Sequence, residues 1–141
     1  MTMTATTQSN PTQSHAESAL RKVLLANTEF SIATGLACLI LGGPVADVLG
    51  VDQVWLIRLL GAGLFGFAGL VFLVSRSSRS ILQRWSREIS MADVGWVAAT
   101  GVVIGLGWLS TGGAIIMAII AAVVLAFGLA QHHFRTSMLA Q

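Results

Sequence analysis

The stretch GAIIMAIIAAVVLAFGLA, residues 113–130, contains no charged side chain and no strongly polar one. A helix needs roughly 20 such residues to cross about 30 Å of hydrocarbon, where the backbone must satisfy its own hydrogen bonds. Three earlier stretches have the same character, at about Val23–Leu41, Val54–Val74 and Met91–Leu109. The sequence therefore predicts an all-α membrane protein, a bundle of four transmembrane helices.

The composition agrees, because only 10% of the residues are charged and the mean hydropathy is +0.79, whereas about 25% are charged in an ordinary soluble domain. Residues 1–18 are polar and lack Lys and Arg, which is typical of a disordered tail. We expect one transmembrane domain over residues 19–134 and a short C-terminal tail over residues 135–141.

The basic residues predict the orientation. Seven of the eight lie in the tails or in the connection between spans 2 and 3: Arg21, Lys22, Arg76, Arg79, Arg84, Arg87 and Arg135. Basic residues stay cytoplasmic during insertion, so we expect both termini and the connection between spans 2 and 3 to be inside. The same rule explains the net charge of +2, and we expect no nucleic-acid partner.

The sequence also predicts helical structure within two of the connections between spans. Pro44–Gly50 begins with a residue suited to a first helical turn and ends with a helix stop, which predicts a short outer half-helix. Between spans 2 and 3, apolar residues recur at helical spacing at Ile81, Leu82, Trp85 and Ile89. Arg79, Arg84 and Arg87 lie off this stripe, which favours an interfacial helix contacting anionic lipid head groups; a solvated basic loop is the alternative.

Small or weakly polar residues form stripes along the spans. They are Asn27, Ser31, Thr34 and Cys38 in span 1, Arg58, Ala62, Phe65 and Gly69 in span 2, and Gly101 with Gly105 in span 3. Membrane helices pack closely through such faces, so we expect a homo-oligomer or contacts with other membrane protein subunits, besides membrane lipids. A solute pathway is the alternative.

Ionisable residues inside spans are functional candidates. Asn27, Asp93, Gln131 and His132 share a depth near the cytoplasmic side, and such a polar cluster can bind a proton or a head group. Asp93 also follows Ser90 by three residues, the spacing of a helix-start capping box. Both interpretations remain open at this point.

Arg58 enters span 2 from the outer side, where Asp47 and Asp52 are the available anions. A buried guanidinium without an anion is costly, which predicts an outer clamp between Arg58 and one of these carboxylates, with an anion or substrate site as the alternative. Glu29 points away from the span 1 stripe. Pairing with Lys22, a neutral form facing lipid and a protein contact are equally open for it.

No catalytic, cofactor or metal site is predicted. His132 and His133 point to different faces of a helix and the third histidine, His15, is remote, which removes a haem between spans. The single lysine precedes the spans, and no glycine-rich phosphate loop is present. We therefore expect a protein that is not an enzyme.

Short motifs of the spans resemble those of small uncharacterised four-span bacterial integral membrane proteins. They are Asn27-x-x-Phe30-Ser31 with Gly35-Leu36, Arg58 with Gly61, and Asp93-x-x-Trp96-Val97. The resemblance covers about Leu24 to Gln131, and the overall plan is similar to the DoxX-like group. It implies a four-helix bundle in a bacterial cytoplasmic membrane. Some DoxX-like proteins are associated with quinone-linked redox chemistry, although no cofactor motif is matched here.

These features favour a non-enzymatic interaction or assembly component, such as a subunit of a larger membrane complex. A transporter or channel for a small solute or protons is an alternative that needs a water-accessible cavity at Asp93 or Arg58. A quinone-linked redox protein is another, and it needs a membrane-level groove with polar groups for a ring carbonyl.

The orientation can be tested by cysteine labelling. In a variant in which Cys38 is replaced by serine, Ser78→Cys should react with a membrane-impermeant maleimide only after the cells are opened, because the connection between spans 2 and 3 is inside. Gln53→Cys, in an outer connection, is the matched control. Labelling at position 78 in intact cells would overturn the orientation.

Overall fold

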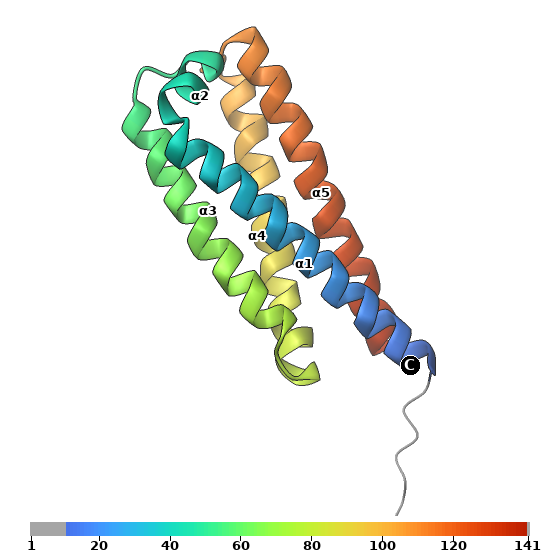
Figure 1. Ribbon diagram of the computed structural model, residues 1–141. Coiled ribbons are helices and arrows are strands. Elements are labelled where there is room, and N and C mark those ends of the chain that lie inside the picture. Colours follow the sequence, from blue (N-terminus) through green and yellow to red (C-terminus); the bar gives the residue numbers. More distant parts are fainter. Residues whose placement is uncertain (1–10, 141) are drawn as a thin grey trace, which may run out of the picture.

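The computed structural model describes residues 11–140, which form five helices (Figure 1). They are α1 (Pro11–Ile40), α2 (Gly42–Leu49), α3 (Val54–Ser75), α4 (Arg79–Gly105) and α5 (Thr111–Leu139). All except α2 are long and apolar enough to cross a membrane. The predicted all-α bundle of four spans is thereby confirmed.

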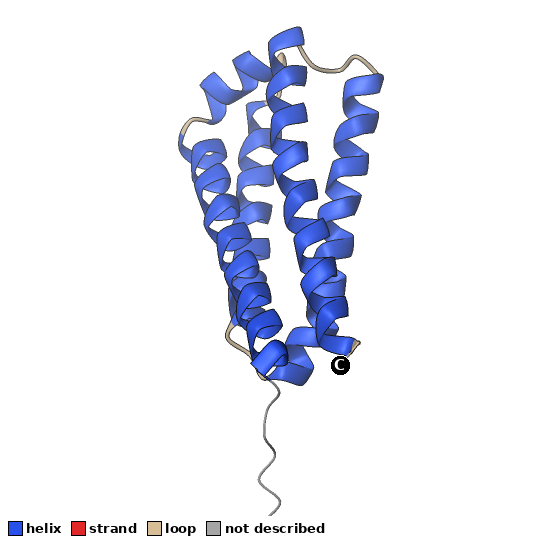
Figure 2. Cartoon of the chain, turned by 90° about the vertical axis from the view of Figure 1, so that its right-hand side faces the viewer, coloured by secondary structure: helices blue, strands red, loops and turns tan. Residues whose placement is uncertain are grey.

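The four long helices run side by side, and α2 lies at the end of the bundle where α1 ends and α3 begins (Figures 1 and 2). α1 packs most extensively on α3, and α4 on α5, while α1 and α5 join the two pairs. Contacts between α3 and α4 are far sparser. The bundle is therefore closed on the α1–α5 side and loosely packed between α3 and α4.

Glycines set the close approach of α1 and α3. A Cβ added to Gly61 would lie 2.8 Å from the carbonyl oxygen of Gly35 and 2.9 Å from Cys38 Cβ. The buried face of α3 accordingly includes Ile57, Gly61 and Ala68. Close backbone contact replaces the hydrophobic effect as the source of helix association in lipid.

The stripe predicted for span 2 is not the buried face, since Arg58, Ala62, Phe65 and Gly69 are exposed. At about 100° per residue, Arg58 and Phe65 lie beside the packed face through Gly61, and the Phe65 ring still reaches Gly35 of α1. Small residues occur on both faces of α3, and their spacing alone could not identify the packed one. The span 1 stripe does face inward, with Asn27, Ser31 and Cys38 buried.

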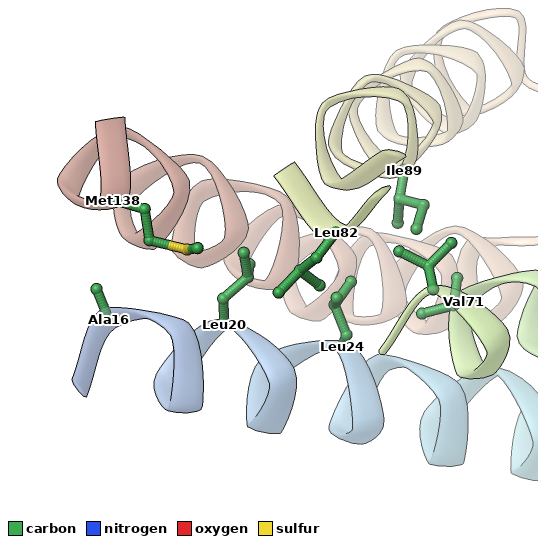
Figure 3. Packing of buried hydrophobic residues seen from close by; sticks show 8 residues of the cluster. Ala16, Leu20, Leu24, Val71, Leu82, Ile89 and Met138 are labelled. Carbon is green, nitrogen blue, oxygen red and sulfur yellow. The ribbon is translucent and has the colours of Figure 1, made fainter. Parts of the chain in front are cut away.

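An apolar core fills the end of the bundle where α1 begins and α5 ends (Figure 3), which is the inner end in the predicted orientation. It contains Ala16, Leu20 and Leu24 of α1, Val71 and Val74 of α3, Leu82 and Ile89 of α4, and Met138 of α5. The structure thus differs from the expected tails, because residues 11–18 and 135–139 are helical. Burial of Ala16 and Met138 offsets the entropy of ordering these turns; residues 1–10 lie outside the described part.

Arg21 connects α1 to the end of α3 through hydrogen bonds. Its guanidinium donates hydrogen bonds to the carbonyl oxygens of Ser75 and Ser77, the latter at 2.9 Å. Nη2 also pairs with the Glu17 carboxylate at 2.8 Å. A cation is favourable at a helix C-terminus, whose last carbonyl groups lack partners within the helix.

The basic segment between spans 2 and 3 is helical, as expected, but it is not a separate interfacial element. α4 runs without interruption from Arg79 into the third span. Leu82 and Ile89 are buried in the inner core, whereas Ile81 and Trp85 remain exposed. The apolar stripe is divided because only one of its edges reaches α1 and α3.

The opposite end, outer in the predicted orientation, is held together by α2, which confirms that a short helix follows span 1. Gly50 comes directly after α2, and its φ of 75° is accessible to glycine at little cost. Ser110 then joins α2 to α5: its backbone N–H donates to the Leu49 carbonyl at 2.9 Å, and its Oγ donates to the Val48 carbonyl at 2.7 Å. The same Oγ accepts from the Gly113 N–H, which caps α5.

The α1–α3 contact predicts a sharp difference between two glycines of α3. Gly61→Ala should destabilise the protein by about 1–3 kcal/mol, because the added methyl group overlaps backbone. Gly66→Ala is the matched control, since a Cβ there meets nothing within 4 Å. Thermal unfolding in detergent should give a lower midpoint for the first variant only, and equal midpoints would refute this close contact.

Candidate intramembrane binding site

Asp93 lies at the centre of a polar cluster formed by three helices. Its side chain is 3% exposed. Oδ2 accepts a hydrogen bond of 3.0 Å from Asn27 Nδ2 of α1 and another of 3.0 Å from Gln131 Nε2 of α5. The predicted proximity of Asn27, Asp93 and Gln131 is therefore confirmed.

Small residues on α4 and α5 bring the cluster together. A Cβ added to Gly128 would lie 3.5 Å from Asp93 Cβ, so this glycine allows the two helices to approach. Ser90 Oγ donates to the Gly128 carbonyl at 2.9 Å. The contact holds α4 and α5 in register one turn from Asp93.

The capping-box interpretation of Ser90 and Asp93 is wrong. α4 begins at Arg79, so Asp93 lies about four turns inside the helix, where the backbone N–H groups already have partners. The prediction placed the helix start too late, because the apolar stretch starts only at Met91, whereas the helix starts earlier.

His132 does not belong to the polar cluster. It is exposed and lines a different hollow between α4 and α5, together with Arg87 and Arg135. His132 follows Gln131 directly, so its side chain is turned by about 100° around the helix. The two residues share a depth, but only Gln131 points inward.

An apolar pocket of about 320 Å³ adjoins the cluster. Every long helix contributes: Phe30, Ser31 and Thr34 with Asn27 from α1, Leu60, Gly63, Leu64 and Phe67 from α3, Ala92 and Trp96 with Asp93 from α4, and Ile120 and Val124 from α5. This volume is within the range of sites for small molecules, about 300–1,000 Å³. The sequence did not reveal the pocket, because a void depends on how the four faces fit together.

The pocket is bordered by exposed residues on α3 and α4, two neighbouring helices that are sparsely packed against each other. Gly63 of α3 and Ala92 of α4 both line it and are exposed. A Cβ on Gly63 would meet nothing within 4 Å. The void therefore reaches the side of the bundle between α3 and α4, which faces lipid when the four helices span a membrane.

Polar atoms around the pocket have unused capacity. Both amide donors bind Asp93 Oδ2, and Oδ1 accepts no hydrogen bond from residues 11–140. The Thr34 hydroxyl is likewise without a partner in this part of the chain. Gln131 Oε1 is buried and lacks a donor among the described residues. The cluster can thus accept and donate further hydrogen bonds.

The predicted outer clamp is wrong. Arg58 is exposed and forms no ion pair with Asp47 or Asp52, which are also exposed. Its side chain covers Gly42 instead, and a Cβ there would lie 3.0 Å from Arg58 Cγ. Because α2 begins so soon after α1, the arginine side chain contacts a glycine rather than an anion.

The remaining charged candidates lie on the surface. Glu29 is exposed and forms no ion pair with Lys22 within the described residues. Arg84 and Arg87 are exposed and Arg79 is half-buried, all in the first turns of α4. Their contact with lipid head groups stays a prediction.

The fold and the site define a multi-pass α-helical protein of the kind that resides in membranes, with a polar centre inside its bundle. Over residues 11–140, no group of three His, Cys, Asp or Glu side chains is placed to hold a metal ion. Comparisons with protein-family models, curated proteins and solved structures give no match. The interpretation of the site therefore depends on its geometry.

The Asn27–Asp93 hydrogen bond can be measured with a double-mutant cycle of Asn27→Ala and Asp93→Ala. Interhelical hydrogen bonds in membranes average about 0.6 kcal/mol and reach about 1.7, so we expect a coupling within this range. Asp93→Ala alone should cost more than Asn27→Ala, because it leaves two buried amides without an acceptor. Independent effects on the free energy of unfolding would rule out the bond.

Proposed function

We propose that this protein is a non-enzymatic membrane component that binds a lipid-soluble molecule in the pocket beside Asp93. The single observation that carries the proposal is an apolar void of about 320 Å³ that ends at the buried Asp93 carboxylate and the Asn27 amide bound to it. Apolar walls with a few convergent polar groups are the usual construction of a small-molecule site. Binding without a chemical step suits a chain in which no catalytic set was found.

The polar end of the pocket suggests what kind of molecule fits. Asp93 Oδ1 can accept a hydrogen bond from a hydroxyl or amino group, and the Thr34 hydroxyl can donate one. Phe30, Phe67 and Trp96 offer aromatic surfaces to a ring or an acyl chain. The ligand class is therefore an apolar molecule with a small polar head. It would enter sideways from the bilayer, between Gly63 and Ala92.

An assembly role is the second candidate, and exposed glycines favour it. Gly66 and Gly69 of α3 and Gly101 and Gly105 of α4 are exposed, and a Cβ on any of them would meet nothing within 4 Å. Glycines on a lipid-facing surface permit close packing of another membrane helix. A second copy or another subunit would then bind beside the α3–α4 gap.

The transporter and the quinone-linked redox protein each require a specific feature of the pocket. A transporter needs water to reach Asp93, but the pocket walls are apolar, and Arg58 does not line it. A quinone has the right form for the pocket, since a ring carbonyl can accept from Thr34. The resemblance to DoxX-like proteins points in the same direction. The proposal is completed by a bacterial inner membrane, which the resemblance implies, and by cytoplasmic termini, which the charge distribution supports.

Ligand binding can be tested by gentle extraction followed by mass spectrometry of the intact protein. The wild type should retain a lipophilic molecule. Gly63→Leu should lose it, because the leucine fills the pocket edge, whereas Gly66→Leu, on the same helix but outside the pocket, should keep it. Asp93→Asn should reduce retention several-fold while preserving the fold, since it keeps the shape and removes the charge.

Equal retention by wild type and Gly63→Leu would contradict binding in this pocket. A stable protein partner, with no small molecule bound to the wild type, would favour the assembly role instead. Recovery of a quinone as the retained molecule would identify the ligand class.

A further inference from the structure

A second hollow lies between α4 and α5 at the inner end of the bundle, separate from the pocket beside Asp93. It measures about 170 Å³ and is lined by Ser86, Arg87, Ser90 and Met91 of α4 and by His132 and Arg135 of α5. Two arginines and a histidine thus surround one small space. No acidic residue lines it.

The two arginines of this hollow are not neutralised by the protein. The side chains of Arg87, His132 and Arg135 form no ion pair or hydrogen bond with any other side chain in residues 11–140, in contrast to Arg21, which pairs with Glu17. Like charges close together repel unless an anion lies between them. Their convergence is therefore explained most directly by an anionic ligand.

Local packing creates the space for that anion. Ser86 and Ser90 are buried and lie one turn apart on α4, and their small side chains leave a recess between the longer ones. Their hydroxyls donate to the carbonyl oxygens of Gln83 and Gly128, so the charged residues are left as the donors. The recess is smaller than a typical drug-sized site, which suits a compact anion.

We propose that Arg87, His132 and Arg135 form a binding site for a phosphate group. Guanidinium groups bind phosphate oxygens through paired hydrogen bonds, and two of them with an imidazole match a group that has several acceptor oxygens. Carboxylates offer fewer oxygens to donors arriving from two helices.

The surroundings indicate that a lipid carries this phosphate. Met91 lines the hollow and is 58% exposed, and the exposed Val94 and Leu129 follow on the same two helices toward the middle of the spans. Arg87 lies about 9 Å closer to the inner end than Asp93, from six residues at 1.5 Å each. A head group in the recess would thus continue into acyl chains lying over an apolar surface.

Titration of the full chain in a non-ionic detergent tests the proposal. The probes are short-chain phosphatidic acid, phosphatidylcholine of the same chain length, and inorganic phosphate. Phosphatidic acid should bind more tightly than phosphatidylcholine. Arg87→Gln and Arg135→Gln should each weaken it by at least about tenfold, the effect of losing one charge-assisted interaction. Arg76→Gln, which removes an exposed cation after α3 that does not line the hollow, should change binding less than twofold.

Binding or competition by inorganic phosphate with the same dependence on Arg87 and Arg135 would support the site and identify soluble phosphate as its source. Equal weakening by Arg76→Gln would overturn the proposal, because it would reduce the effect to general surface charge. Equal affinity for phosphatidylcholine, or binding of no probe, would overturn it as well. Circular dichroism of each variant checks that the substitution leaves the helices intact.

Discussion

The hydrogen bonds that Asp93 accepts from Asn27 and Gln131 connect α1, α4 and α5 at one point. In a bilayer a buried carboxylate cannot turn to water, so it must find its donors on neighbouring helices. The positions of these three helices are therefore linked through a single side chain. α3 takes no part in the cluster and is held by other contacts, chiefly the glycine contact with α1 and the guanidinium of Arg21.

This division explains where the bundle is open. α1, α4 and α5 share the polar centre, while α3 packs on α1 and leaves its side toward α4 sparsely filled. Gly63 supplies no side chain to close the gap, and the pocket reaches the lipid-facing surface there. The same features that tighten one side of the bundle thus leave a membrane-level opening on the other. Its polar end and apolar walls are the basis for the proposed binding of a lipid-soluble molecule.

The number of spans, the outer half-helix and the contact between Asn27 and Asp93 could be predicted from the sequence. Long apolar stretches, a Pro–Gly bounded segment and a similar distance from the starts of two parallel spans carry that information directly. The direction of a side chain was less predictable where a helix has small residues on two faces, as α3 does. Arg58 does not contact the anions predicted for it, and His132 faces outward rather than into the polar cluster.

Neither the helix ends nor the voids could be predicted from the sequence, for different reasons. The polar turns around Ala16 and before Met138 look like tails, yet a few buried contacts in the inner core suffice to order them. The pocket depends on the distances between four helices and has no local signal. Both hollows, and the convergence of Arg87 and Arg135 at the second one, became apparent only from the packing of side chains.

The central claim is that lipid-soluble molecules reach Asp93 from the bilayer rather than from water. Trp96 lines the pocket, and its fluorescence can be isolated by replacing Trp55, Trp85 and Trp108 with phenylalanine. In vesicles of lipids brominated on their chains, Trp96 emission should be quenched, and Gly63→Leu should relieve the quenching, whereas aqueous iodide should have little effect. Strong quenching by iodide with none by the brominated lipids would contradict the account and indicate a water-filled path.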